Sequence, residues 1–133
     1  MFTYSARVDG LTVEMLTGFF VGWPSPPSAE THLATLQGST HVVVASYEGV
    51  IVGFINALSD GVMAAYIPLL EVRPEYQGQG VGTELVRRML ELLAPMYMVD
   101  LLCDAEVAPF YDRIGMQRLI GMASRNRAST ALA

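Results

Sequence analysis

A glycine-rich turn at residues 77–82, with the sequence QGQGVG, is the stretch of this chain best suited to chemistry. Its glycines occupy alternate positions, which removes side chains and lets another group approach the main chain closely. The sequence after the turn predicts a helix, whose first N–H groups and positive dipole end point into the cleared space. This pattern is typical of an anion site, and it is best suited to phosphate or pyrophosphate.

Two alternative roles for the glycines are consistent with the residues alone. Tight packing between strand and helix could require them. A dinucleotide site is the second alternative, although its G-x-G-x-x-G fingerprint meets Thr83 in place of the third glycine. Asp100 stands near the ribose-binding distance of such sites, whereas Pro74 interrupts the run into the turn. A P-loop is excluded, because no Gly-Lys-Ser/Thr follows.

A strand and a helix must position the turn. The preceding residues, LLEV at 69–72, predict a buried strand. The residues after it place charges such as Glu84 and Arg88 on one helical face, and the helix ends near Leu93 because Pro95 cannot continue it. The apolar face of this helix consists of Leu85, Val86, Met89, Leu90, Leu92 and Leu93.

Two segments carry a resemblance to a known family. Residues 72–82, VRPEYQGQGVG, resemble the acetyl-coenzyme A motif of the GCN5-related N-acetyltransferase (GNAT) superfamily, whose pattern Gln/Arg-x-x-Gly-x-Gly/Ala is met by Gln77, Gly80 and Gly82. Residues 109–116, PFYDRIGM, are similar to the family's FYxxxGF segment, with Met116 where phenylalanine is more usual. The resemblance covers roughly residues 42 to 122.

The resemblance implies an acetyltransferase that uses acetyl-CoA as co-substrate. In that fold the main chain of Leu70 to Val72 pairs with the pantetheine arm of coenzyme A and polarises the thioester carbonyl. Phe110 lines the cofactor groove, and Asp104 stands where the family commonly has asparagine, as a residue of the cleft. The pyrophosphate is held by the main-chain amides of Gln77, Gly78, Gln79, Gly80, Val81, Gly82 and Thr83.

Two side chains are predicted to be catalytic. Tyr111 matches a family tyrosine that often protonates the departing thiolate, although it could simply pack on the cofactor. An amine must lose a proton before it attacks, and a carboxylate is the usual means. Glu71 is our choice for this base, because it interrupts an apolar strand beside the presumed reaction centre and alternation separates it from its neighbours. The other candidate carboxylates are Asp60, Asp100 and Asp104.

The remaining patterns predict an α+β fold with a mixed, mostly antiparallel sheet flanked by helices. We expect a single domain over residues 1–133, with a frayed tail from 123 to 133. The other expected elements are strands at 2–8, 41–47, 50–58, 62–72, 97–103 and 116–122, and helices at 11–20, 29–36 and 105–114. Ser28 is a plausible N-cap, and Gly38 and Gly115 are expected to end helices.

The composition of the chain excludes some classes of binding partner. A net charge of −5 argues against nucleic acid, and no apolar run is long enough for a membrane helix. No signal peptide is visible, so we expect a cytoplasmic protein. His32 and His41 lack neighbours at ligand spacing, which predicts no metal. Cys103 is expected to be a small buried hydrophobe.

The predicted reaction is direct acetyl transfer to a primary amine, since no paired Cys or Ser nucleophile is visible. A small-molecule amine is our first expectation for the acceptor, and a peptide N-terminus or lysine is the second. A non-catalytic acyl-CoA-binding domain is a further alternative. Trp23, in a proline-rich loop, could wall the acceptor site or simply anchor the loop. Edge strands that pair between copies lead us to expect a homodimer.

Overall fold

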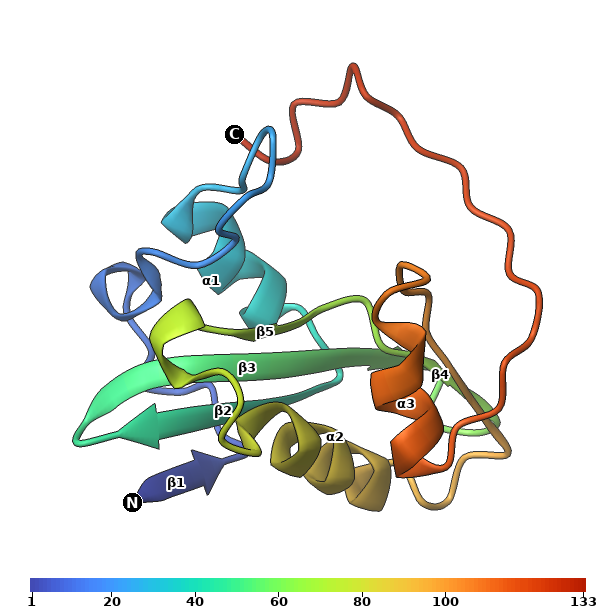
Figure 1. Ribbon diagram of the computed structural model, residues 1–133. Coiled ribbons are helices and arrows are strands. Elements are labelled where there is room, and N and C mark those ends of the chain that lie inside the picture. Colours follow the sequence, from blue (N-terminus) through green and yellow to red (C-terminus); the bar gives the residue numbers. More distant parts are fainter.

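A six-stranded sheet organises the computed structural model, which describes residues 1–133 (Figure 1). The strand order is β1-β2-β3-β4-β6, and β5 pairs separately with β3. All pairings are antiparallel except that of β4 with β6. This mixed, mostly antiparallel sheet confirms the predicted fold class. The strands are β1 (Phe2–Ser5), β2 (His41–Tyr47), β3 (Val50–Ser59), β4 (Ala64–Tyr66), β5 (Leu70–Val72) and β6 (Met98–Asp100).

Three α-helices flank the sheet: α1 (Ala29–Gln37), α2 (Val81–Leu92) and α3 (Ala108–Ile114). The predicted caps are present. The N–H of Thr31 donates to the Ser28 hydroxyl at 3.1 Å, and Gly115 ends α3 with a φ of 98°. Two short 3-10 helices, η1 (Val13–Leu16) and η2 (Pro74–Tyr76), complete the elements. No helix is both long and apolar enough to cross a membrane.

Both faces of the sheet are covered, which explains why β2 and β3 are almost continuously apolar. Along β2, Val43 and Ala45 pack on the α2 side, whereas Val42 and Val44 pack on the α1 side. The α2 side is filled by most of the helical face that the sequence predicted, with Leu85, Val86, Met89 and Leu93 fully buried. Leu92, which was also expected on this face, is exposed. The α1 side contains Leu16, Phe19, Phe20, Leu36, Ile51 and Phe54.

One predicted strand is broken in the structure. Residues 62–72 form β4 and β5, separated at Ile67 to Leu69, where Pro68 has no N–H to donate. The side chain of Asn56 on β3 fills the gap in the ladder, because its Oδ1 accepts the Leu69 N–H at 3.1 Å and its Nδ2 donates to the Ser39 hydroxyl at 3.0 Å. As a result β4 pairs with β6 but β5 does not, and the two central strands diverge.

The strands expected at 2–8 and 97–103 are shorter, as β1 and β6, and the helix expected at 105–114 begins only at Ala108. Two further element predictions were wrong in kind. The expected helix at 11–20 is only the 3-10 turn η1, because glycine at 18 and a positive φ of 63° at Phe20 bend the chain away. The expected strand at 116–122 does not form, since no backbone group of that segment beyond Met116 makes a backbone hydrogen bond. Instead the chain from residue 117 leaves α3 as an extended arm and returns to α1 (Figure 1), where the Ser28 N–H donates to the Leu132 carbonyl.

His32 lies in an aromatic cluster beneath α1. Its ring is 1% exposed and stands 4.3 Å from the Phe54 ring, 4.9 Å from Phe20 and 5.4 Å from Phe19, measured between centroids. Neither ring nitrogen has a hydrogen-bond partner. Burial disfavours the charged imidazolium and lowers the pKa of His32 from 6.5 to about 4; the nearby backbone of Leu16 opposes part of this shift, and the positive charge of Arg73 adds to it.

This burial predicts acid sensitivity. The unfolded chain binds a proton at His32 near pH 6.5 and the folded protein only near pH 4, so stability is fully present above pH 6.5 and falls as the pH drops toward 4. The total loss is roughly 3 kcal/mol. We expect the His32→Leu variant to flatten this part of the pH–stability curve, measured by urea unfolding, and the His41→Gln variant to leave it unchanged. An equal slope in wild type and His32→Leu would contradict this assignment.

Candidate functional site

The glycine turn leads into α2 with its amides free. Gly78 and Gly80 have φ values of 76° and 85°, a region that glycine enters without strain, and a Cβ built at either would meet nothing within 4 Å. The first hydrogen bond of the helix runs from the Glu84 N–H to the Gly80 carbonyl. None of the six N–H groups from Gly78 to Thr83 donates to a protein group. They form a row of donors at the positive end of a 12-residue helix.

Gln77 differs from the other amides that were expected to hold the pyrophosphate. Its N–H donates to the Pro74 carbonyl at 3.3 Å, and its side-chain Nε2 donates to the Val72 carbonyl at 2.9 Å. Gln77 therefore fixes the entry of the turn against the end of β5, and the row of free donors begins at Gly78.

Two further glycines hold this row against the sheet. A Cβ at Gly53 on β3 would lie 3.1 Å from the Glu71 carbonyl oxygen and 3.4 Å from the Val81 side chain, so its absence lets β5 and the start of α2 approach. A Cβ at Gly82 would lie 3.5 Å from Phe110, which places the Phe110 ring over the first turn of α2. The turn, β5 and α3 therefore meet at one corner of the molecule.

The first turn of α2 contains one acidic residue, Glu84, and its negative charge is neutralised by neighbouring arginines. Glu84 accepts from Arg87 at 2.7 Å and from Arg88 at 2.6 Å. These hydrogen bonds hold the pKa of Glu84 at about 2, so the carboxylate is ionised and paired at any ordinary pH. The helix N-terminus thus keeps its positive character.

A hollow of about 460 Å³ lies where β5 and the segment after β6 diverge. It brings together Glu71 from β5, Asp104 from the loop after β6, and Tyr111 from α3. Trp23 contributes to the wall, as the sequence suggested it could. Three of the predicted chemical side chains therefore share one cavity although 40 residues separate the first from the last.

Glu71 is half-buried in this hollow. Leu70 and Val72 pack into the core on the α2 side, so alternation directs the Glu71 side chain to the opposite side of β5, as predicted. Burial raises the pKa of the Glu71 carboxyl, and the backbone N–H of Phe20 opposes part of that shift. A carboxylate in this position accepts a proton more readily than one in water.

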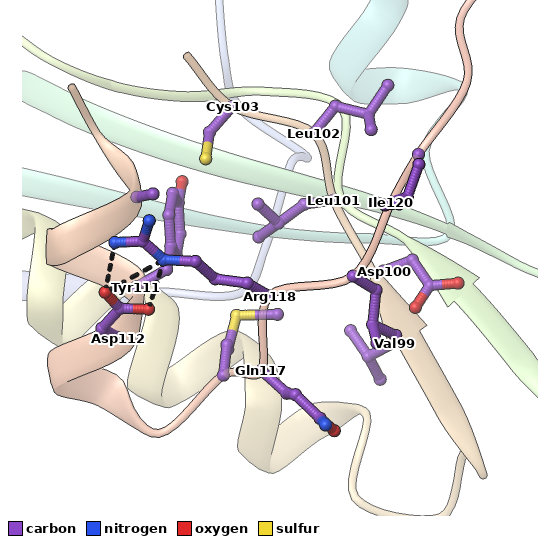
Figure 2. Close-up of a pocket in the computed structure, with 14 residues that line it drawn as sticks. Val99, Asp100, Leu101, Leu102, Cys103, Tyr111, Asp112, Gln117, Arg118 and Ile120 are labelled. Atoms are coloured by element: carbon purple, nitrogen blue, oxygen red, sulfur yellow. Dashed lines mark hydrogen bonds and ion pairs between the residues drawn. The ribbon is translucent and has the colours of Figure 1, made fainter. Parts of the chain in front are cut away.

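Tyr111 borders the hollow from α3, and its ring packs against Phe110 with centroids 4.9 Å apart. In Figure 2 its hydroxyl points toward the side chain of Cys103. Burial raises the pKa of Tyr111 to about 12, and the nearby Cys103 acts in the same direction. The phenol therefore stays protonated at neutral pH and is available as a donor.

The other candidate carboxylates have different surroundings. Asp60 accepts the N–H groups of Val62, Met63 and Ala64 at 2.8, 2.9 and 3.2 Å, so it stabilises the turn between β3 and β4. Asp100 ends β6 and does not border this hollow. Of the four carboxylates, only Glu71 and Asp104 face it.

Sequence reasoning missed two residues of the hollow. Cys103, expected to be buried, is exposed there, because it follows the end of β6 where no further strand covers it. Arg125 reaches the hollow from the C-terminal arm. No local pattern signals Arg125, since its place depends on how the arm crosses the molecule. No three histidine, cysteine or acidic side chains are grouped as metal ligands.

Comparison with known proteins identifies the class to which this fold and corner belong. The model of the acetyltransferase (GNAT) family matches residues 9–116, which is most of the chain. The chain therefore belongs to the GNAT family of acetyltransferases, a family that generally uses acetyl-CoA. The fit of the free amides and open glycines to a diphosphate agrees with that co-substrate.

Named sequence relatives are distant and longer than this chain. GCN5-related N-acetyltransferase 2, chloroplastic, from Arabidopsis thaliana is 29% identical over 118 residues, which cover 73% of this chain and 46% of that protein. Histone acetyltransferase TAP1 from Glycine max is 30% identical over 109 residues, with 73% and 47% covered. This chain thus spans about half the length of these relatives.

Solved structures share the whole fold. A crystal structure of a proposed acetyltransferase from Deinococcus radiodurans R1 is 46% identical, with a TM-score of 0.90, covering 93% of this chain and 87% of that one. A GNAT family protein from Streptococcus pneumoniae TIGR4 is 26% identical, with a TM-score of 0.79 over 96% and 99%. Glucosamine-6-phosphate N-acetyltransferase from Arabidopsis thaliana, at 17% identity and a TM-score of 0.71 over 96% and 99%, shares the fold alone.

The free amides predict where coenzyme A binding is sensitive. We expect the Gly80→Ala variant to weaken binding about tenfold or more, because a methyl group enters the cleared space and disturbs the donors. Gly10→Ala is the matched control, since Gly10 also has a positive φ, of 92°, with nothing within 4 Å of its Cβ. Both variants carry similar backbone strain, so only Gly80→Ala should change the dissociation constant in calorimetry.

A thermal-shift comparison tests the dinucleotide alternative. Coenzyme A at 100 times its dissociation constant stabilises the folded state by about 2.7 kcal/mol, whereas a ligand that does not bind gives no shift. We expect a shift with coenzyme A and none with NAD. The reverse result would contradict the coenzyme A site.

Proposed function

We propose that the protein transfers an acetyl group from acetyl-CoA directly to the primary amine of a small molecule. The observation that carries this proposal is the shared corner, in which free amides of the α2 N-terminus lie near a hollow that contains a half-buried carboxylate and a protonated phenol. The free amides can hold a diphosphate, and the carboxylate and the phenol can transfer the protons that acylation of an amine requires.

Binding of the co-substrate would rest mainly on the backbone. The amides from Gly78 to Thr83 hold the pyrophosphate, and the main chain of Leu70 and Val72 pairs with the pantetheine arm. Phe110 and Asp104 border the same groove. Coenzyme A supplies the activated thioester, and the chain supplies its orientation.

Proton transfer divides between two side chains. Glu71 takes a proton from the acceptor amine, directly or through water, and its raised pKa suits it to that task. Tyr111 donates to the sulfur that leaves, because its phenol stays protonated throughout the neutral range. Asp104 is the second candidate for the base, since it borders the same hollow.

The acceptor is proposed to be a small amine on the basis of the hollow itself. Trp23 and Arg125 are among the side chains that line it, and its volume of about 460 Å³ suits a compact molecule. The alternative is a peptide N-terminus or lysine, which the name of the histone acetyltransferase relative favours. A non-catalytic acyl-CoA-binding domain is the remaining alternative.

The acceptor class can be tested with labelled acetyl-CoA. The eight basic residues are all arginine, so the protein has no lysine of its own to acetylate. Label in a peptide fraction therefore reports a peptide acceptor, and label in a small-amine panel reports the proposed class. Initial-rate plots should intersect for direct transfer, whereas parallel lines would indicate a covalent intermediate. Coenzyme A binding without turnover on either panel would leave the non-catalytic alternative.

Removal of the phenol should slow the chemical step. We expect Tyr111→Phe to lower kcat about 100-fold, because the departing sulfur loses its donor, while coenzyme A affinity changes little. Tyr66→Phe, on β4, is the matched control and should retain full activity. Because the pKa of Tyr111 is about 12, wild-type activity should show no decline due to this group below pH 10. Unchanged kcat in Tyr111→Phe would mean that the tyrosine only packs on the cofactor.

Loss of the base should change the pH profile. Glu71 acts when it is deprotonated, and burial places its pKa above that of an ordinary carboxyl group. We therefore expect kcat/KM to rise with pH as Glu71 ionises, at a higher pH than an exposed carboxyl group would give. We expect the Glu71→Gln variant to lack this rise with pH and to have a kcat/KM about 100-fold lower than that of the wild type. Glu14→Gln is the exposed control. If Asp104→Asn instead removes this rise with pH, Asp104 is the base and the assignment of Glu71 is wrong.

A further inference from the structure

Another hollow, of about 300 Å³, shares Glu71 with the hollow that contains Tyr111. Its walls are the loop at residues 18–21, which follows η1, and part of the chain between Glu71 and Gln77. Arg73 is the only basic side chain that borders it, and we call it the Arg73 hollow. Alternate residues of an extended chain point to the same face, so Glu71 and Arg73 project from one face of β5 and its continuation. The wall of the Arg73 hollow therefore carries both a carboxylate and a guanidinium.

Arg73 differs from the other arginines of this chain. The other seven are exposed, and four of them form ion pairs with acidic side chains. Arg73 is partly buried and takes part in no ion pair, and the same is true of Glu71. Burying a charge costs free energy unless an opposite charge or hydrogen bonds compensate it. Two opposite charges thus border one hollow without pairing with each other.

The contacts of Arg73 fix its guanidinium and leave its outer N–H groups free. Its Nε donates to the Ile51 carbonyl at 2.8 Å, and its Cζ lies 4.3 Å from the centre of the Phe19 ring. A Cβ at Gly18 would lie 2.7 Å from Nη1, so the glycine makes room for the guanidinium. Neither Nη group donates to a protein group. The only fully buried side-chain polar atoms without a partner are the ring nitrogens of His32, so both Nη groups are accessible.

We infer that Arg73 binds the carboxylate of a small free amino acid, the amine of which lies at Glu71 and is the acceptor. This inference rests on the proposed function and specifies its substrate class. The N–C bond of the product amide forms as the C–S bond of the thioester breaks. One proton of the neutral amine passes to Glu71, and Tyr111 gives a proton to the sulfur, so coenzyme A leaves as the thiol. Proton exchange with water restores both side chains.

The spacing of the two charges suits a short molecule. Two residues of extended chain span about 7 Å, and a charge-assisted hydrogen bond at each end occupies about 2.8 Å. The amine and the carboxylate of an α- or β-amino acid can therefore contact Glu71 and Arg73 at the same time. A volume of about 300 Å³ is at the lower end of the range for ligand pockets, which favours an amino acid with a small side chain.

The charge of the Arg73 hollow favours a carboxylate over a phosphate group. A guanidinium binds either anion through two parallel N–H bonds. A phosphate monoester carries a charge of about −1.5 to −2 at pH 7, and Arg73 is the only cation at this hollow that could balance it. The Glu71 carboxylate borders the same hollow and repels the excess negative charge. The single charge of a carboxylate leaves no such excess.

Paired acceptors test the role of Arg73. The probes are alanine, serine and β-alanine, each assayed beside its own amide, which has nearly the same size but lacks the negative charge. We expect Arg73→Gln to lower kcat/KM for the acids about tenfold or more, mainly through KM, and to change it little for the amides. The ratio of the variant to the wild type for each acceptor cancels the difference in basicity between the two amines.

Two further variants serve as controls for the loss of the guanidinium. Arg73→Lys keeps the charge but not the planar fork, so it should retain part of the preference for the acids. Arg113→Gln removes an exposed arginine that borders neither hollow, and it should leave the preference unchanged. Activity on the amides shows that each variant is folded.

Several outcomes of these assays would overturn the inference. An equal loss for acids and amides in Arg73→Gln would show that Arg73 only supports the loop at residues 18–21. Turnover of the amides without turnover of the acids would indicate a peptide N-terminus as the acceptor. Faster turnover of phosphoethanolamine than of β-alanine would assign the Nη groups to a phosphate. Weaker binding of coenzyme A by Arg73→Gln would place Arg73 at the co-substrate. In all four cases the proposed acetyl transfer to an amine still stands.

Binding of the carboxylate can also be measured without turnover. The Arg73 Nε–H donates to a carbonyl, which protects its proton from exchange, and Arg73→Lys identifies its NMR signal by removing it. In the complex with coenzyme A, alanine should shift this signal and alaninamide should not. No shift with any of the three acids would overturn the inference. A shift without turnover of any amine would support the amino-acid site and contradict the proposed catalytic function.

Discussion

The buried side chain of Asn56 is the contact on which the rest of the site depends. It is 1% exposed and satisfies the Leu69 N–H at the point where the pairing of β3 passes from β4 to β5. A buried donor without a partner costs about 1–3 kcal/mol, so this amide stabilises an interruption that a regular ladder would not contain. The interruption turns β5 away from β6, and the hollow with Glu71 on one side and Tyr111 on the other exists because those strands diverge.

Close backbone approach provides the second constraint. Gly53 and Gly82 allow β5, α2 and α3 to meet without intervening side chains, and the meeting point is the turn with its free amides. The corner with the free amides and the hollow with Glu71 and Tyr111 are therefore parts of one packing arrangement. A shift of α2 along the sheet would move both the free amides and the Phe110–Tyr111 pair.

Much of this arrangement could be predicted from local signals. The period of α2, the Ser28 and Gly115 caps and the alternation that separates Glu71 from Leu70 and Val72 are properties of short segments, and the structure contains them. The sequence did not predict the interruption at Pro68, because apolar residues on both sides, VMAAYI before it and LLEV after it, are typical of one continuous strand. The strand expected at 116–122 has the right composition but no paired neighbour, which shows that β-propensity describes a fit to a sheet rather than a property of the segment. The exposure of Cys103 follows from the same missing neighbour.

The turn offers main-chain N–H groups, whereas the hollow is lined by side chains, so substitutions in the two places have different consequences. Every amino acid except proline carries an N–H, so the outward side chains of the turn, such as Gln79, can vary while the row of donors persists. The walls of the proposed acceptor hollow consist of side chains, Trp23 and Arg125 among them, and each replacement there alters shape or charge. Under the proposed function, a lineage can therefore acquire new acceptors through changes in these walls while the backbone donors for the acyl carrier are retained.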